Sequence, residues 1–313
     1  MDSKQRLLNL FNNKGIDRVP IWLLFPYHPF SAYVDVYNLP AYQEILKYKR
    51  KYVDIFDRRS FNTGFCLSTS PEIKEERKKY EEKGKIIEEH VVKFKDVVLN
   101  EKRVGKGSIT TTTEKLVKSI EDLDKILEMP YEPPRPDLSQ FFEEKKELGN
   151  RGVMMASTGD PLGILYNICS IENFAIWTLT ERDKLISFLD EMYNRYLDFY
   201  EYLLENDIGP VYFIVGAEFA GPPVVNPENF NLLCTKYVKG IVDLIRSYGK
   251  KSIVHYHGNI KDVLDGFKKI NPDGIHTIEA PPVGNCTLKE AREVLENTIL
   301  IGNMQYEDLR SKT

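Results

Sequence analysis

Two histidines separated by a single residue are the strongest chemical feature of this sequence. His255 and His257 follow the apolar run 252–254, which is typical of a buried β-strand. Side chains two residues apart lie on the same face of a strand, so the two imidazoles are expected to project together. Imidazole binds zinc and several other ions. The pattern predicts a metal site, or alternatively one histidine bonded within the sheet and one that binds substrate without metal.

A glutamate after a neighbouring apolar run extends this pattern. Glu218 lies in the Gly-rich and Pro-rich segment 216–223, directly after the apolar run 211–215. With His255 and His257 it would supply three of the four ligands of a tetrahedral zinc ion. We therefore predict these three residues as metal ligands, with zinc as the cofactor. The alternative is that Glu218 only forms an ion pair with an arginine.

Further polar residues follow the other apolar runs, and these are predicted to complete the site. Asp160 is predicted, with Glu218 and His257, to be catalytic, and Asn259 either binds substrate or caps the following helix. Among the cysteines, Cys286 is a weaker candidate for a late zinc ligand, and Cys234 is expected in the core. The predicted substrate-binding residues are Tyr27, His28, Arg58, Arg59, Asn259, Glu279 and Gln305.

The elements that must position these residues alternate between short apolar runs and amphipathic helices. Continuous apolar runs are typical of parallel strands covered by helices, and a series of them predicts a TIM-type (β/α)8 barrel. An eighth strand is missing, because only eight residues follow Gln305. The predicted strands are 20–25, 52–56, 152–156, 211–215, 252–255, 274–278 and 298–302.

One segment departs from this alternation. Residues 90–113 contain alternating and β-branched residues, which predict an antiparallel hairpin inserted into the barrel domain. The mixed charges of residues 74–89 are typical of a solvated helix face. The proline-rich stretch 130–136 is interpreted as an internal loop, because strands of the same type follow it. We therefore predict a single domain over residues 1–313.

Local signals also predict individual helices. Apolar residues recur at helical spacing through residues 183–205, which predicts a helix packed on the core. Asn226 with Pro227, and Thr287 with Glu290, are typical of helix starts. Ser119 and Asp122 form an approximate version of the same signal.

Composition excludes some classes of function. The 313 residues have a formal net charge of -4, so nucleic acid is not an expected partner. No apolar run approaches the roughly 20 residues of a membrane span. The N-terminus lacks the apolar core of a signal peptide, and the four cysteines lie far apart. We expect a cytoplasmic protein without disulfides.

Several motifs together resemble the uroporphyrinogen decarboxylase superfamily, and more closely its cobamide-dependent (corrinoid) methyltransferase branch. The resemblance covers almost the whole chain and implies a TIM-type barrel. It is carried by the segments Asp17-Arg18-Val19-Pro20, Gly216-Ala217-Glu218, Asn226-Pro227-Glu228-Asn229-Phe230, His255-Tyr256-His257-Gly258-Asn259, Asn285-Cys286-Thr287-Leu288 and Gly302-Asn303-Met304-Gln305.

The resemblance also shows where this chain departs from its relatives. Decarboxylases of the family carry an arginine-rich motif after the first strand, whereas residues 25–30 contain no arginine. The methyltransferases hold zinc with a Glu, a His-x-Cys pair and a late Cys. Glu218 and His255 match that pattern, His257 replaces the first cysteine, and the late cysteine is absent. An imidazole in place of a thiolate makes a bound thiolate a poorer nucleophile.

The resulting hypothesis is a metal-assisted methyltransferase that acts with a corrinoid protein or a small methylated substrate. One alternative is a decarboxylase or lyase of a small acid or tetrapyrrole, with Arg58 and Arg59 holding carboxylates. Another is a non-catalytic subunit that binds a corrinoid protein. All three need a polar pocket at the ends of the strands.

Overall fold

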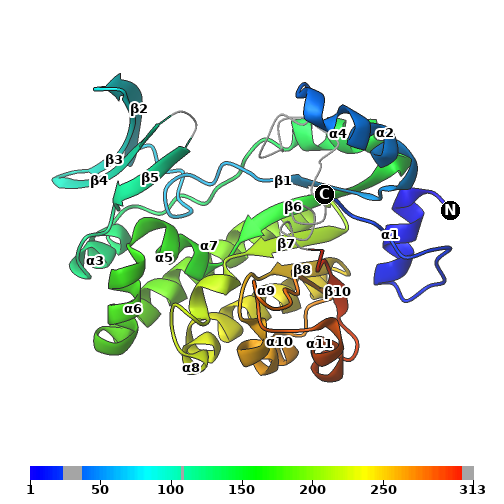
Figure 1. Cartoon of the computed structure of the whole chain (residues 1–313). Coiled ribbons are helices and arrows are strands. Elements are labelled where there is room, and N and C mark those ends of the chain that lie inside the picture. The colour runs from blue at the N-terminus through cyan, green and yellow to red at the C-terminus, as the bar shows by residue number, and fades with distance from the viewer. Residues whose placement is uncertain (24–36, 107–108, 305–313) are drawn as a thin grey trace.

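The computed structural model describes residues 1–23, 37–106 and 109–304. Its central element is a parallel sheet of six strands in the order β1-β6-β7-β8-β9-β10 (Figure 1). These strands span Ile55–Arg59, Gly152–Gly159, Val211–Val215, Lys251–His255, Gly274–His276 and Ile299–Ile301. Each strand of this sheet pairs with the strand that follows it in this order, as in a TIM-type barrel. Between β1 and β6 the chain forms the separate antiparallel sheet.

The predicted strands are confirmed for the later part of the sheet and corrected at its start. β6 to β10 lie within the predicted runs or extend them by a few residues. The second run is displaced, because β1 begins at Ile55 instead of Tyr52. Of the first run, the described residues 20–23 form no strand, although the carbonyl oxygen of Ile21 accepts a hydrogen bond of 2.7 Å from the Asp54 amide.

The two faces of the sheet carry different side chains. Met154, Tyr212 and Val254 point to one face and join the large core formed with the helices. Their neighbours Met155 and Phe213 point to the other face, which we call the inner face. Alternate residues of a strand lie on opposite faces, so each strand contributes to both cores. The inner-face core also contains Leu7, Phe11, Phe56, Val153, Val211 and Ile253.

Helices cover the outer face, and α5 to α11 lie along one side of the sheet (Figure 1). The predicted helix 183–205 is confirmed as α7 (Arg182–Glu205). The N-caps Asn226 and Thr287 are also confirmed, the latter as a full capping box with Glu290. The helix start predicted at Ser119 and Asp122 differs, because Ser119 makes no capping bond to α3. The Asp122 carboxylate accepts hydrogen bonds from the amides of Lys118 and Ser119.

The remaining helices have these bounds. The α-helices are α1 (Ser3–Phe11), α2 (Gln43–Tyr52), α3 (Glu121–Leu127), α4 (Ser139–Leu148), α5 (Pro161–Ile168), α6 (Ile171–Thr180), α8 (Pro227–Phe230), α9 (Lys236–Ser247), α10 (Leu264–Ile270) and α11 (Leu288–Val294). The short helical turns are η2 (Pro40–Tyr42), η3 (Gly149–Arg151), η4 (Ala217–Ala220), the π-helix η5 (Asn231–Thr235) and η6 (Ile260–Val263).

A second sheet lies between β1 and β6 in the chain and is antiparallel. It consists of β2 (Lys74–Glu82), β3 (Lys85–Phe94), β4 (Val97–Lys106) and β5 (Ile109–Glu114). The predicted hairpin at 90–113 is therefore part of a larger sheet. The predicted helix face over 74–89 is wrong, because β2 pairs with β3 along its whole length. Every residue of β2 is exposed, so the prediction of solvation is correct.

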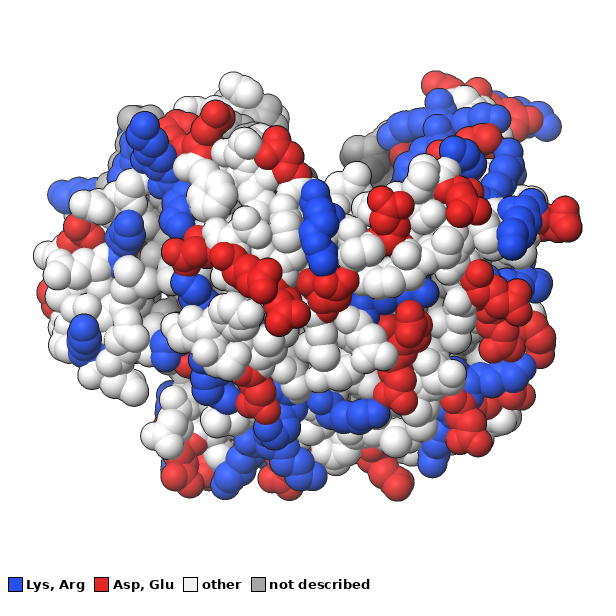
Figure 2. Space-filling view, turned by 180° about the vertical axis from the view of Figure 1, so that it is seen from behind, with Lys and Arg blue, Asp and Glu red and all other residues white. Residues whose placement is uncertain are grey.

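Charged residues of both signs are interspersed over the face shown in Figure 2. This agrees with the small formal net charge of -4. Within the described ranges, no helix is both long enough and apolar enough to cross a membrane.

Candidate active site at the ends of the parallel strands

Two histidines from adjacent strands form the centre of the candidate site. His255 ends β8 and His276 ends β9, and strand pairing places them directly beside each other. Their Nδ1 atoms are 2.8 Å apart, and their rings stack with centroids 4.9 Å apart. The side chains lie on the inner face, where the rings of Phe213 and Trp22 pack against His276.

Burial keeps both of these histidines neutral. It lowers the pKa of His255 to about 3 and that of His276 to about 2, and nearby cationic groups act in the same direction. A neutral imidazole has one N–H donor and one acceptor nitrogen. A hydrogen bond between two Nδ1 atoms therefore needs one ring protonated at Nδ1 and the other at Nε2. The pair must present one Nε2 lone pair and one Nε2–H group.

His257 has a different electrostatic environment. Its Nδ1 lies 3.0 Å from Glu279 Oε1, and this hydrogen bond raises the pKa of the imidazole. The pKa of Glu279 is lowered by the same contact. Glu279 is held in turn by the Gly258 amide, which donates to its Oε2 at 2.6 Å. The ring of His257 is perpendicular to that of His255, with centroids 4.4 Å apart, as expected for residues that share a strand face.

Two buried carboxyl groups follow the neighbouring strands β6 and β7. Asp160 is fully buried and caps α5, with its Oδ1 accepting a hydrogen bond of 2.8 Å from the Gly163 amide. Burial raises the pKa of Asp160 to about 7, and the negative charge of Glu218 contributes. Burial likewise raises the pKa of Glu218, while His257 opposes the shift. Asp160 Oδ2 and Glu218 Oε2 are buried and have no hydrogen-bond partner among the described residues.

The two adjacent arginines of β1 point to opposite faces. Arg58 lies on the inner face, with its guanidinium 4.8 Å from the centroid of the Phe213 ring. Arg59 is buried on the outer side, where it forms ion pairs with Glu144 of α4 and, at 3.3 Å, with Asp57. The structure thus brings Arg58 to the histidines and Arg59 to α4. In the described part of the chain, neither arginine forms an ion pair with Glu218.

The predicted zinc ligands fit the metal chemically but not geometrically. Carboxylate oxygen and imidazole nitrogen are ordinary zinc ligands, and Glu218 has a buried oxygen without a partner. However, among the residues that the structure describes, no three His, Cys, Asp or Glu side chains are placed to share one ion. Glu218, His255 and His257 therefore do not form a preformed site in the described part of the chain.

The other predicted residues have mixed outcomes. Tyr27, His28 and Gln305 lie outside the described residues. Asn259 precedes η6 and its side chain makes no capping bond. Cys286 is buried, with its Sγ directed to the Thr287 carbonyl oxygen at 3.4 Å, and Cys234 is buried as expected.

Sequence reasoning did not single out His276 as a functional residue. The predicted strand 274–278 is confirmed for residues 274–276, and its register with β8 identifies His276 as the partner of His255. A histidine inside an apolar run was the available signal. Asp17 and Arg18 of the family motif have a structural role, because they form ion pairs with Arg6 and Asp54 respectively.

Together, the curled parallel sheet and the polar cluster at its carboxyl ends define an α/β fold of the TIM-barrel type. The family described as uroporphyrinogen decarboxylase (URO-D) matches residues 103–312. This is more than half of the chain, which therefore belongs to that family, as predicted. No curated protein matches the sequence significantly.

A solved structure shows the same fold. The methyltransferase from Methanosarcina mazei superimposes with a TM-score of 0.59 and 14% sequence identity, over 97% of this chain and 83% of that one. At this identity the likeness concerns the fold. The predicted α/β barrel type is thus supported, while the described residues form an open sheet of six parallel strands.

Proposed function

We propose that this protein is a methyltransferase that moves a methyl group from a corrinoid protein or a small methylated molecule to an acceptor. The observation that carries the proposal is the His257–Glu279 pair beside the neutral His255–His276 pair, at the carboxyl ends of the parallel strands. Active sites of TIM-type barrels lie at this end. Family membership and the fold of the methanogen enzyme support the same class of reaction.

In this proposal His257 is the general base. A thiol or hydroxyl acceptor must lose its proton before or as it attacks a methyl group. The new bond to the methyl carbon forms as the bond from methyl to donor breaks, and the electron pair of that bond leaves with the donor. The Nδ1–H of His257 is held by Glu279, which leaves Nε2 to take that proton. The hydrogen bond with Glu279 raises the pKa of His257 and so favours the imidazolium that forms when the proton is taken up. Glu279 then acts as a positioning residue that stabilises the imidazolium.

Arg58 is the proposed binding group for an anionic part of the substrate. Its guanidinium lies on the same face as the histidines, against Phe213. Guanidinium binds carboxylate and phosphate with paired hydrogen bonds. Asn259, with Tyr27, His28 and Gln305, remains a proposed contact to substrate. Arg59 is engaged with Glu144 and contributes to the position of β1 instead.

Zinc held by Glu218, His255 and His257 is an alternative to His257 acting as the base, because with Nδ1 bonded to Glu279 the single Nε2 lone pair cannot both bind zinc and take a proton. It is supported by the donor chemistry and by the unpartnered oxygen of Glu218. When bound, zinc would acidify a coordinated thiol or water at neutral pH. Binding requires the three side chains to rearrange. Metal analysis of protein purified without chelators should find stoichiometric zinc that is lost in His257→Ala, and its absence would remove zinc from the proposal.

The methyl transfer is tested with methylcobalamin as donor and 2-mercaptoethanol as acceptor. We expect loss of the methylcobalamin absorption and formation of the methyl thioether, measured by mass spectrometry. His257→Asn should lower the rate at least about 100-fold, the contribution of a general base. Glu279→Gln should also slow the reaction and shift its pH profile.

A matched control is available on α11. Glu293→Gln removes an exposed carboxylate and should leave the rate unchanged. If the thioether does not form above the rate without protein, methyl transfer from a corrinoid to a thiol is excluded. Equal rates in His257→Asn and the unmodified protein would remove His257 from the chemistry.

The position of Arg58 favours one second candidate, a carboxy-lyase for a small acid. An arginine on the inner face can hold a substrate carboxylate beside the histidines. This reaction releases carbon dioxide, which can be trapped from a radiolabelled acid. Release that is lost in Arg58→Gln and insensitive to chelators would support the lyase against the methyltransferase.

A further inference from the structure

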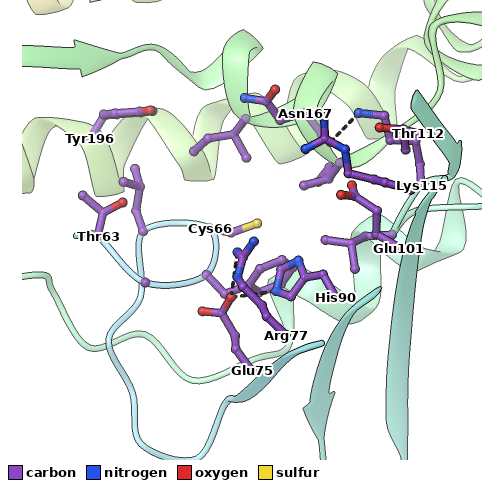
Figure 3. A pocket seen from close by; sticks show the side chains of 17 residues that line it. Thr63, Cys66, Glu75, Arg77, His90, Glu101, Thr112, Lys115, Asn167 and Tyr196 are labelled. Carbon is purple, nitrogen blue, oxygen red and sulfur yellow. Dashed lines mark hydrogen bonds and ion pairs between the residues drawn. The ribbon is translucent and has the colours of Figure 1, made fainter. Parts of the chain in front are cut away.

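A cavity of about 470 Å³ lies between the antiparallel sheet and the helices of the parallel domain, away from the histidine cluster. One wall is formed by β2, β3, β4 and β5, and the other by α5, α7 and the segment 63–67 (Figure 3). The wall on the side of the parallel domain includes the apolar residues Leu116, Ile164 and Ile168. The sheet-side wall is charged, so the cavity has two chemically distinct sides.

Part of the charged wall is already satisfied internally. Glu75 accepts from His90 at 2.8 Å and from Arg77 at 3.5 Å. The hydrogen bond with His90 lowers the pKa of Glu75. This network holds the side chains of three residues from β2 and β3 in place. It leaves little capacity in Glu75 for another charged group.

Two cations on the same cavity form no ion pair with any described residue. Lys115 Nζ donates to the Asn167 carbonyl oxygen at 2.9 Å and forms no ion pair. Arg103 lies on β4 at an exposed position on the rim, opposite Glu88 of β3. Glu88 forms its ion pair with Lys79, and Arg103 forms neither a hydrogen bond nor an ion pair with the described residues. Guanidinium and ammonium groups so placed are suited to a carboxylate.

A carboxylate in the same cavity also lacks a partner. Glu101 lies two residues before Arg103 on β4, so the two share the face that lines the cavity. Glu101 is partly buried and forms no ion pair with any described residue, although it stands opposite His90 in the strand pairing. A partly buried carboxylate of this kind calls for a donor such as an ammonium group.

We infer that this cavity binds a small zwitterion of the amino-acid class. The carboxylate of the ligand is held by Arg103 and Lys115, and its ammonium group by Glu101. Its side chain lies against Leu116, Ile164 and Ile168. A simple anion would leave Glu101 without a partner, and a simple cation would leave Arg103 and Lys115 without one. A zwitterion satisfies both signs and adds no net charge.

The test is calorimetric titration of the full chain with the standard L-amino acids as probes. We expect saturable binding, at one ligand for each chain, for at least one of them. The analogues of that amino acid that lack the amino group or the carboxylate should bind at least about tenfold more weakly. Equally tight binding of either analogue overturns the zwitterion, and no binding by any amino acid overturns the inference.

Substitutions then assign the binding to this cavity. Arg103→Gln, Lys115→Gln and Glu101→Gln should each weaken binding by about tenfold or more, the effect of losing a charge-assisted hydrogen bond. Lys102→Gln is the matched control, because Lys102 lies between Glu101 and Arg103 on β4 and does not line the cavity. Folding is checked by thermal unfolding. If all four variants bind equally, the amino acid binds elsewhere.

Discussion

The Nδ1 atoms of His255 and His276 lie 2.8 Å apart at the ends of two neighbouring strands. Both rings are neutral, because burial holds their pKa values at about 3 and about 2. The contact therefore couples their tautomers, so that one ring presents an Nε2 lone pair and the other an Nε2–H group. The ring of His255 also makes an edge contact with that of His257, the proposed base.

Replacing His276 should change the pH dependence of stability. The unfolded imidazole has a pKa near 6.5, above the native value, so the unfolded state binds more protons below that pH. Stability is therefore lost as the pH falls below about 6.5, by up to about 1.4 kcal/mol per pH unit for this residue. Between about pH 6 and pH 5, the free energy of unfolding of His276→Phe should therefore fall by about 1.4 kcal/mol less than that of the unmodified protein, as measured by urea unfolding. An unchanged slope would contradict a neutral buried His276.

The ion pair between Arg59 and Glu144 should matter for folding instead of substrate binding. Glu144→Ala leaves a buried guanidinium with reduced compensation, which costs roughly 3 kcal/mol in such pairs. We expect a clear decrease in the urea midpoint. Glu143→Ala, at an exposed position of the same helix, is the control and should be near neutral. A small effect at Glu144 would mean that Asp57 alone satisfies Arg59.

Asp160 should make the protein less stable at alkaline pH. Its pKa is about 7 in the folded chain, above the ordinary value of 3.8, so the folded state binds more protons between these values. The stability associated with the protonated carboxyl is present at low pH and is lost as the pH rises towards and through 7. Asp160→Asn keeps a capping oxygen and has no charge. Its stability relative to the unmodified protein should increase between pH 5 and pH 8, by roughly 3 kcal/mol. A constant difference across this range would exclude the raised pKa.

Gly216 should tolerate no side chain. A Cβ there would lie 2.2 Å from Asp160 Oδ1, and the residue has a φ of +145°. Gly216→Ala should therefore cost more than about 2 kcal/mol, from steric overlap and backbone strain together. Gly249→Ala also has positive φ but has no atoms within 4 Å, so it should cost only about 1 kcal/mol. Similar losses in both variants would show that overlap with Asp160 is relieved by a small shift.

Short-range patterns were enough to predict most of the parallel strands and several helices. The runs that became β6 to β10 are apolar along their length because both faces of those strands are covered. The capping box of Thr287 and Glu290 depends on residues three apart, and it formed as predicted. The proximity of the His255 and His257 rings is also what the spacing of the two residues predicts, although β8 ends at His255. Family membership was also visible in the motifs.

Long-range pairing decided the rest. Lys74–Glu82 is exposed along its whole length, so its sequence has no apolar period that separates a strand from a helix, and only the pairing with β3 makes it a strand. Arg58 and Arg59 are adjacent in sequence, and the faces of β1 send one to the histidines and the other to Glu144. The contact between His255 and His276 depends on the register of β8 with β9, because a shift of one residue would turn His276 to the other face.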